Sequence, residues 1–477
     1  MSQEHVEERS TVLEPREVPV TPRDLDRYRS LIPPGRFAEL QTGAAEATAA
    51  MSSRALWNIS STEVGGGVAE MLHAIVGYAL GARITARWLV IEGDHDFFAI
   101  TKRIHNRLHG AEGDEGDLEV KERAHYEEVL EENGRIISRR IAPGDVVVLH
   151  DPQTAGLAPR LVERGALVVW RCHVGADVTN HWTEGAWTFL RPYLTPCREL
   201  VFSRSSYAPE WVPSEKLTVI VPSIDPFSPK NRRMSTRTVL DRVTGLGLLP
   251  GTEVDQSLSS GGRGAGRIRT ARSTLSVSTP LVMQISRWDR LKDMAGVLEA
   301  FATSGALREE AHLALVGPEV EGVADDPDGA EILGECLAAW ESLPVPVRSR
   351  IHIVSLDMGD ADENALTVNA LQRFAAVITQ KSLAEGFGLT VAEGMWKAKS
   401  VVASAVGGIV DQITDDTGIL LDDPRDLDAF SRAVALLVDD RALRLRMGER
   451  ARRRVRDCFV GDRHLLAFAG LIGRVTS

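Results

Sequence analysis

Short apolar, β-branched segments alternate with helical segments along most of this chain, and they come in two series. Segments this short and this apolar are typical of strands that are buried on both faces. The first series is 55–60, 87–93, 146–150, 167–173, 200–203 and 217–222, and the second is 281–286, 312–317, 351–356, 375–379 and 401–404. Strands that alternate with helices indicate βαβ units and parallel sheets. The sequence therefore predicts an α/β protein with two Rossmann-like, doubly wound domains.

A stretch rich in Gly, Ser and Arg, residues 249–279, separates the two series and includes SLSSGGRGAGRIRTARS. Such a composition buries too little apolar surface to order itself. Its arginines could form a nucleic-acid tail, but a mobile basic loop is the simpler interpretation. We therefore expect an N-terminal arm with helices at 1–50, a first domain at 51–227, a partly flexible linker at 228–280 and a second domain at 281–456.

The charge and hydropathy of the chain exclude several classes of protein. Its 477 residues carry a net charge of −12, which argues against nucleic acid as the main partner because phosphate binding needs a concentrated basic surface. No apolar run approaches the ~18 residues that a membrane span needs. The polar N-terminus lacks the apolar core of a secretory signal, so we expect a cytoplasmic protein without membrane partners.

The cysteines and histidines give no sign of a metal site. The four cysteines are scattered and none forms a C-x-x-C pair, so reduced thiols are expected rather than disulfides or zinc ligands. His105 and His109 are four residues apart on an expected helix, but the Glu of the zinc-protease pattern is absent between them.

The first motif with chemical content is STEVGGGVAE, which follows a strand and opens a helix. Gly65, Gly66 and Gly67 let the backbone approach a ligand closely, and the helix N-terminus offers N–H groups to phosphate or sugar oxygens. A tight turn alone would need one glycine, so three favour a binding site.

The second motif is SRWDRLKD, at the end of the first strand of the second series. Ligands of such sheets bind beyond the carboxyl ends of the strands. Arg287 and Lys292 could therefore converge on a diphosphate and neutralise it. An ordinary solvated charge cluster is the alternative.

The third motif, QKSLAEGFGLTVAE, also follows a strand. Glu385 opens a glycine-rich turn, and Glu393 lies about two helical turns further on, near the same face. Carboxylates at this spacing can bind two hydroxyl-bearing groups of one elongated ligand. Two exposed surface acids are the alternative, which the flanking apolar residues disfavour.

The fourth group of polar residues ends two consecutive strands of the first series. His150 and Asp151 end one strand, and Arg171 and His173 end the next. Strand ends of this architecture line the ligand crevice. A single histidine on a strand is more often structural than catalytic. His173 is a candidate site residue only because His150 and Asp151 are expected to end the neighbouring strand.

These motifs resemble those of the retaining glycosyltransferase family four, which has the GT-B fold. Glu385 to Glu393 match the E-x7-E pattern of the family, and Arg287 with Lys292 resembles its R-x-x-x-x-K-G motif, with Asp293 in place of the glycine. Within the family, the segments VGGGVAEML, VIEGDHDFF, HNRLHG, LHDPQ, RCHVGAD, VPSIDP and ISRWDRLK, together with the third motif, resemble the trehalose synthases that use a nucleotide sugar.

The resemblance implies a role for each matching residue. Arg287 and Lys292 would stabilise the departing diphosphate, with Glu385 and His173 beside the reacting sugar as further catalytic residues. Donor-binding residues would be Gly65, Gly66, Gly67, Gly386, Phe387, Gly388, Leu389 and Glu393, with Glu393 on the ribose. Acceptor-binding residues would be Glu70, His150, Asp151 and Arg171. The resemblance also implies that no metal or other cofactor is required, that 457–477 cross back to the first domain, and that a homodimer can form.

The implied reaction joins the glucose of UDP-, ADP- or GDP-glucose to glucose, giving α,α-trehalose with retention. Two alternatives stay open. A trehalose phosphorylase would split trehalose with inorganic phosphate and needs no nucleotide. A related transferase of the same family would use another acceptor, because acceptor specificity depends on first-domain loops.

Overall fold

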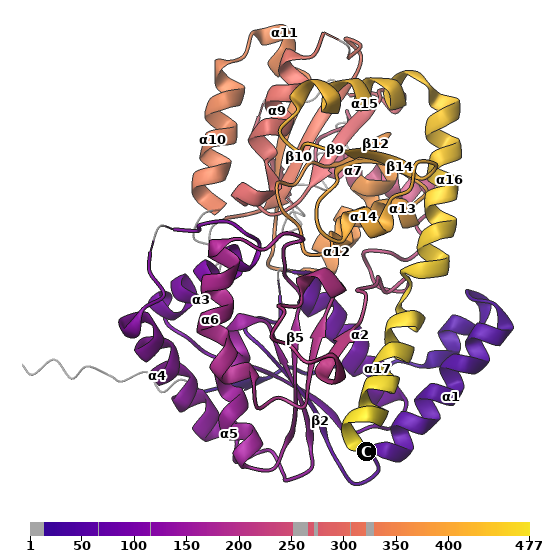
Figure 1. Cartoon of the computed structure of the whole chain (residues 1–477). Helices are drawn as coiled ribbons and strands as arrows, with labels where there is room; N and C mark the ends of the chain where they lie inside the picture. Colours follow the sequence, from indigo (N-terminus) through magenta and orange to yellow (C-terminus); the bar gives the residue numbers. More distant parts are fainter. Residues whose placement is uncertain are drawn as a thin grey trace, which may run out of the picture.

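The computed structural model describes residues 14–64, 66–114, 116–250, 266–270, 275–305, 307–320 and 329–477. Two α/β domains lie one above the other, the first drawn in purple and the second in pink to orange (Figure 1). Each domain is built on a sheet of seven strands. The predicted pair of doubly wound domains is therefore confirmed.

The first sheet has the strand order β1-β3-β2-β4-β5-β6-β7. All neighbours are parallel except β1, which pairs antiparallel with β3 at one edge. The strands are β1 (Arg16–Glu17), β2 (Leu56–Ser60), β3 (Ala86–Val90), β4 (Val146–His150), β5 (Leu167–Cys172), β6 (Glu199–Phe202) and β7 (Leu217–Val219).

The second sheet has the order β14-β13-β12-β9-β10-β11-β8, and again only one edge strand, β8, is antiparallel. Its strands are β8 (Gly266–Ile268), β9 (Leu281–Ile285), β10 (His312–Pro318), β11 (Ile351–Leu356), β12 (Val377–Gln380), β13 (Ser400–Ser404) and β14 (Gly418–Leu421). The crossovers between parallel strands are helical, as a parallel sheet requires.

Helices cover both faces of each sheet. Around the first sheet lie α1 (Pro34–Ala50), α2 (Gly67–Gly81), α3 (His95–Leu108), α4 (Val120–Ile137), α5 (Ala158–Glu163), α6 (His181–Leu194) and α17 (Gly461–Thr476). Around the second lie α7 (Thr236–Gly245), α9 (Met294–Thr303), α10 (Gly329–Ser342), α11 (Val345–Arg348), α12 (Ala361–Phe374), α13 (Leu389–Trp396), α14 (Ile409–Gln412), α15 (Leu427–Asp439) and α16 (Arg441–Cys458).

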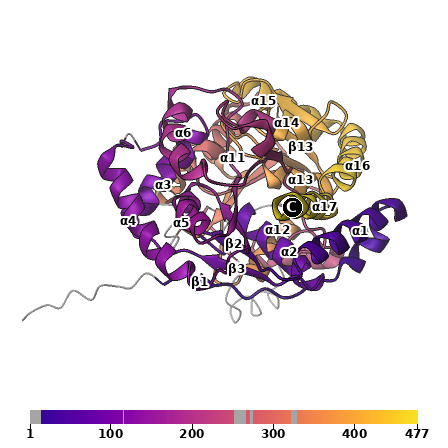
Figure 2. The same ribbon diagram turned by 60° about the horizontal axis from the view of Figure 1, so that its bottom comes forward.

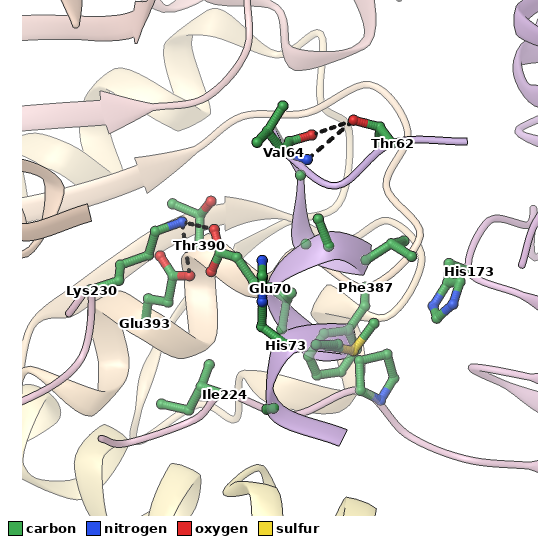
Figure 3. A pocket seen from close by; sticks show the side chains of 18 of the residues that line it. Thr62, Val64, Glu70, His73, His173, Ile224, Lys230, Phe387, Thr390 and Glu393 are labelled. Carbon is green, nitrogen blue, oxygen red and sulfur yellow. Dashed lines mark hydrogen bonds and ion pairs between the residues drawn. The ribbon is translucent and has the colours of Figure 1, made fainter. Parts of the chain in front are cut away.

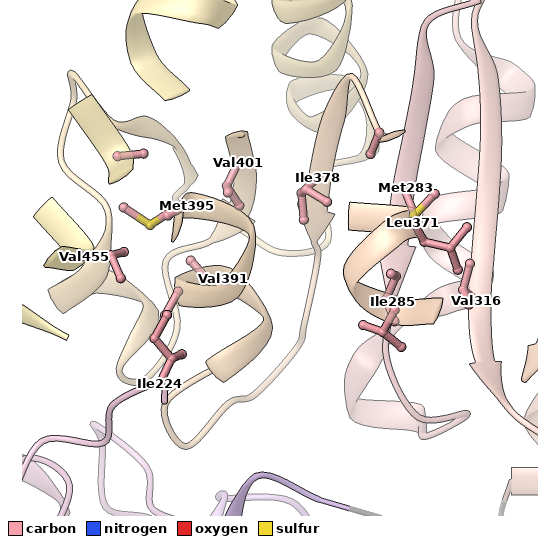
Figure 4. Packing of buried hydrophobic residues seen from close by; sticks show 14 of the residues in the cluster. Ile224, Met283, Ile285, Val316, Leu371, Ile378, Val391, Met395, Val401 and Val455 are labelled. Carbon is pink, nitrogen blue, oxygen red and sulfur yellow. The ribbon is translucent and has the colours of Figure 1, made fainter. Parts of the chain in front are cut away.

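The apolar core of each domain lies between its sheet and these helices. In the second domain, Ile378 and Val401 face Val391 and Met395 of α13, and Met283 of β9 lies beyond Ile378 in the same cluster (Figure 4). All five side chains are fully buried, so this packing fixes α13 against the sheet. The position of α13 matters because it carries one of the predicted site residues.

The described residues 14–50 contain an expected helix, α1, and also extend the first domain. Arg16 and Glu17 pair with β3 and extend the first sheet. Tyr28, in the short 3-10 helix Leu25–Ser30, is fully buried and packs against Tyr78 of α2, with the two rings tilted by 45°. A two-residue edge strand has too few residues to show a pattern, so the sequence could not reveal this pairing.

The expected linker at 228–280 is, where the structure describes it, part of the second domain. Val239 and Val243 of α7 are buried in the core beside α12, and β8 pairs with β11. The apolar face of α7 is only a few residues long and β8 has only three, which hid both in a polar segment. Most of the Gly, Ser and Arg stretch, 251–265 and 271–274, lies outside the described residues.

The last helix, α17, returns to the first domain and lies beside α1 (Figure 2). Phe468, Leu471 and Ile472 are buried in the core that α1 and α2 form against the first sheet. In the part of the chain that the structure describes, no helix is both long and apolar enough to span a membrane.

Candidate active site

A cleft of about 690 Å³ lies between the two domains, where the carboxyl ends of both sheets face each other. Most of the residues that the sequence singled out line it. These are Gly66, Gly67, Glu70, His150, Asp151, His173, Arg287, Lys292, Glu385, Gly386, Phe387, Gly388, Leu389 and Glu393. Gly65 lies outside the described residues. Arg171 is described but does not line the cleft.

An ion pair between Lys292 and Glu385 lies at the centre of the cleft. Lys292 Nζ is 2.7 Å from Glu385 Oε2, and both side chains are less than one-fifth exposed. Gln380 and Ser382 also donate to this carboxylate oxygen, at 3.5 and 3.2 Å. The strand ends of β9 and β12 thus hold one cation and one carboxylate together at the place where the sequence predicted them.

Arg287 lies at the same strand end and is paired with Asp289 at 3.4 Å. Asp289 also binds Lys102 of α3, in the first domain, at 3.2 Å. Although burial opposes it, the attraction of these cations and of Lys292 lowers the pKa of Asp289. Two cations from different domains therefore meet at one buried carboxylate beside the predicted diphosphate site.

Asp293 occupies the position where the family's motif has a glycine. Its backbone is left-handed, with φ of 49° and ψ of 46°, a conformation that glycine and aspartate tolerate best. Its carboxylate caps α9 by accepting the Gly296 N–H and binds the buried Lys381. The substitution thus preserves the backbone turn that presents Lys292.

The glycine-rich loop after Glu385 approaches the first domain closely. A Cβ on Gly386 would lie 2.4 Å from the carbonyl oxygen of His173. The hydroxyl of Tyr207, also in the first domain, donates to the Gly386 carbonyl at 2.6 Å. Gly388, at φ of 80°, precedes α13. Glycine at 386 is therefore required by the contact between the domains as well as by any ligand.

Glu393 is buried at the other end of the cleft, with 3% of its surface exposed. Gln372 donates to its carboxylate at 3.2 Å and Lys230 lies 3.6 Å away. Burial raises the pKa of Glu393, against the opposing effect of Lys230 and Lys397. Figure 3 shows Lys230 between the carboxylates of Glu70 and Glu393, whereas His173 lies on the opposite side of α2 in this view.

Two stacked histidines form the first-domain wall of the cleft. His150 Nε2 faces Asn58 Oδ1 at 3.1 Å, and His150 Nδ1 faces His173 Nε2 at 3.1 Å. Burial lowers the pKa of both, that of His150 to about 3, so both are neutral at pH 7. Since Asn58 Oδ1 accepts, His150 Nδ1 must accept from His173 Nε2, and His173 Nδ1 is left as an acceptor.

Asp151 is buried next to these histidines, and its backbone is left-handed at φ of 62°. Its Oδ1 accepts the backbone N–H of His173 at 2.8 Å. Burial raises the pKa of Asp151 to about 7. This carboxyl group can accordingly donate or accept a hydrogen bond near neutral pH, which suits a sugar hydroxyl.

Two of the predicted acceptor residues lie elsewhere. Arg171 is 1% exposed and donates to His464 of α17 at 2.9 Å, so it joins β5 to α17 rather than facing a ligand. Arg171 lies within β5, whereas His173 follows the end of that strand and lines the cleft. The period-2 alternation of a strand puts residues two apart on the same side, so the sequence pattern could not separate the two. Glu70 lines the cleft but pairs with Lys230 near Glu393, not with the histidines.

The sequence reasoning missed several residues that line the cleft. Lys102, His105 and His109 face it from α3, and Lys230 from the segment before α7. From the sequence, His105 and His109 are compared only with the zinc-protease pattern. In the described part of the chain, no three His, Cys, Asp or Glu side chains are placed to share a metal ion. The i, i+4 spacing of His105 and His109 was a usable signal, since it puts both on one helix face.

Comparisons with known proteins agree with the two-domain organisation. Residues 58–209 match the family described as trehalose synthase, N-terminal domain, and residues 363–454 match glycosyl transferases group 1. The chain is 32% identical over 457 residues to a trehalose synthase of Rubrobacter xylanophilus, covering 94% of this chain and 96% of that protein. A trehalose synthase of Pyrococcus horikoshii is also 32% identical, with the same coverage.

More distant similarities concern phosphorylases and the fold. A trehalose phosphorylase of Pleurotus pulmonarius is 27% identical, over 83% of this chain but only 54% of that protein. The solved α,α-trehalose-phosphate synthase (UDP-forming) of Burkholderia vietnamiensis superimposes with a TM-score of 0.67 at 13% identity, covering 89% of this chain and 99% of that one. The GT-B fold implied by the sequence resemblance is confirmed.

Proposed function

Because this chain belongs to the trehalose synthase family of GT-B glycosyltransferases, we propose that it transfers glucose from a nucleoside-diphosphate glucose to glucose, forming α,α-trehalose with retention. The carrying observation is that three kinds of group line one cleft between the domains. The buried carboxylate of Glu393 lies at one end, Lys292 and Arg287 lie at the strand ends of β9, and the neutral histidines line the first-domain wall.

The donor end suits a nucleotide sugar. A buried, hydrogen-bonded carboxylate such as that of Glu393 can accept two ribose hydroxyls. Lys292 and Arg287 then lie where a diphosphate would follow the ribose, and Glu385 lies beside the sugar that the diphosphate carries. The ribose, the diphosphate and the glucose of the proposed donor would thus each have a partner in the cleft.

The reaction needs charge stabilisation more than a protein base. The bond between glucose C1 and the phosphate oxygen breaks, and a bond from C1 to the acceptor oxygen forms on the same face. The acceptor proton passes to the departing phosphate. Lys292 and Arg287 stabilise the negative charge that develops on that phosphate, a term often worth several kcal/mol. We propose that these side chains stabilise the phosphate charge by themselves, without a metal ion.

The acceptor end suits an uncharged sugar. His150 and His173 are neutral at pH 7, and Asp151 can donate or accept a hydrogen bond. A phosphorylated sugar would call for cations here, whereas hydroxyl groups match these partners. This supports free glucose as the acceptor.

The test is a product assay with glucose and, separately, UDP-, ADP- and GDP-glucose, with and without EDTA. Trehalose formed with a nucleotide donor, and unaffected by EDTA, is the expected result. K292A should lower kcat by about 10²–10³-fold, as loss of one transition-state partner does. R290A is the matched control, because Arg290 pairs with exposed acids outside the cleft.

A parallel reaction contains trehalose and inorganic phosphate. Release of glucose 1-phosphate without any nucleotide would overturn the proposal in favour of a phosphorylase. If the nucleotide sugar is consumed but no disaccharide forms, the result would favour a related transferase with an acceptor other than glucose.

A further inference from the structure

The segment that precedes α7 is bound to the second domain through its backbone. Asn369 donates to the carbonyls of Pro229 and Arg232 at 2.8 and 2.9 Å. Trp396 donates to the Asn231 carbonyl at 3.1 Å. Lys230 lies in the middle of this segment. It therefore moves together with α12 and α13.

The ammonium group of Lys230 contacts carboxylates of both domains. It pairs closely with Glu70 of α2, in the first domain, and lies 3.6 Å from Glu393 Oε1, in the second. Figure 3 shows the Lys230 nitrogen at the corner between the two carboxylates, facing each of them. Since Lys230 is fixed to the second domain, its contact with Glu70 can form only when the two domains are together.

We propose that Lys230 is a positioning residue that keeps the Glu393 carboxylate ready for the donor ribose, and that Glu70 draws Lys230 into this position when the domains close. The inference rests on the proposed function. With the ammonium closer to Glu70, the oxygens of Glu393 retain a neighbouring positive charge but can still accept ribose hydroxyls. Without Glu70, Lys230 pairs with Glu393 directly and competes with the ribose.

The groups that face Glu393 determine how this arrangement responds to pH. Lys230 approaches it from the segment before α7, Glu70 from α2 and Lys397 from the residue that follows α13. Gln372 of α12 donates a hydrogen bond to it. Burial raises the pKa of Glu393, and the two lysines oppose this. Removal of Lys230 raises this pKa further, so the carboxylate becomes protonated at a higher pH.

The experiment measures kcat and the KM of the best nucleotide-sugar donor from pH 6 to 8.5. K230M should raise the donor KM about tenfold at pH 6 and less at pH 8.5, because a protonated Glu393 loses an acceptor. K230R should restore most of the wild-type KM and its flat pH profile. E70Q should raise the donor KM about threefold to tenfold at every pH. The KM for glucose should be unchanged in all three.

R242M is the matched control, since Arg242 pairs with Glu363 on the surface of the second domain, outside the cleft. A donor KM that is unaltered in K230M and E70Q, or an equal loss at all pH values in K230M, would overturn the inference. If K230M does not fold, the donor KM of E70Q is the test of the inference. The side chain of Glu70 is 43% exposed, so this substitution should not prevent folding.

Failure of the proposed function gives a different result. If the wild-type protein makes no trehalose, binding of UDP, ADP and GDP is measured by calorimetry across the same pH range. A pH-dependent loss of binding in K230M would support the inference although the acceptor or reaction is different. If none of the nucleotides binds to the wild-type protein, both proposals are wrong.

Discussion

At the scale of single residues, Asp293 shows how a departure from a motif can preserve its geometry. Its left-handed backbone would cost most residues about 1–2 kcal/mol. Its carboxylate recovers part of this by capping α9 and by pairing with Lys381, which is fully buried. One residue thus shapes the turn after Lys292 and supports the helix that follows.

This predicts the relative stability of two substitutions. D293A and D293G both lose the contact with Lys381, but only alanine is strained in the left-handed conformation, and glycine is also the better N-cap. D293A should be less stable than D293G by about 1–2 kcal/mol. Urea unfolding of the two variants measures the difference. Equal stabilities would mean that the backbone at this position is not left-handed.

Asp151 gives a second prediction, on the pH dependence of stability. Burial raises its pKa to about 7 in the folded protein, far above the value near 4 of an unfolded chain. The folded state therefore holds this proton more tightly, so the free energy of unfolding falls as the pH rises from about 4 to about 7 and is lowest above 7. D151N carries no charge at any pH. Its Tm relative to wild type should therefore be higher at pH 8 than at pH 5, and a constant difference would contradict the assignment.

At the scale of elements, a buried ion pair strengthens the docking of α17 on the first domain. Arg36 of α1 donates to both oxygens of Asp462, the second residue of α17, and to two carbonyls at the end of α16. Both side chains are at most 8% exposed. One guanidinium of the first domain thus contacts both the end of α16 and the start of α17.

D462N should therefore lower the free energy of unfolding by about 3–5 kcal/mol, because it leaves the buried charge of Arg36 without its counterion. The matched control is D457N, which removes a carboxylate at the end of α16 that pairs with Arg456 on the surface. That exposed pair should contribute less than about 1 kcal/mol. Similar losses in both variants, measured by urea unfolding, would contradict this account of the junction.

The sequence predicted the central strands and one edge strand, β7, but missed the other three edge strands that the structure describes. Segments such as 146–150 are wholly apolar and buried, so their composition alone identifies them. The strands β1, β8 and β14 lie at sheet edges, have two to four residues and are partly exposed, which removes the pattern that identifies a strand. The position of such an edge strand is determined by its pairing with the neighbouring strand rather than by its own sequence.

At the scale of the whole molecule, the contacts across the cleft could not be predicted from the sequence. Motifs brought Lys292 and Glu385 to strand ends, because parallel sheets place such residues at one edge. Lys102 with Asp289, and Lys230 with Glu70, pair only through the relative placement of the two domains. No local sequence pattern determines how the two domains are placed relative to each other. These pairs could therefore be identified only from the structure.

Tyr207 provides the most direct test of that placement. Its hydroxyl crosses from the first domain to the carbonyl of Gly386, which follows Glu385 in the centre of the cleft. Asp177 and Arg204 support the same junction by binding the Gly407 N–H at 3.1 Å and Asp411 at 2.7 Å. The hydroxyl of Tyr207 therefore connects the first domain directly to the loop that carries Glu385.

Y207F removes this one hydroxyl and leaves the ring. If contact between the domains excludes water from the donor, the variant should hydrolyse more nucleotide sugar for each trehalose formed, by roughly threefold to tenfold, while its Tm stays close to that of the wild type. Y193F is the matched control, because the Tyr193 hydroxyl bonds to Arg123 and Glu127 within the first domain. Unchanged partition between hydrolysis and transfer in Y207F would mean that water is excluded by the ligands themselves, and that the Tyr207 contact serves only to hold the domains together.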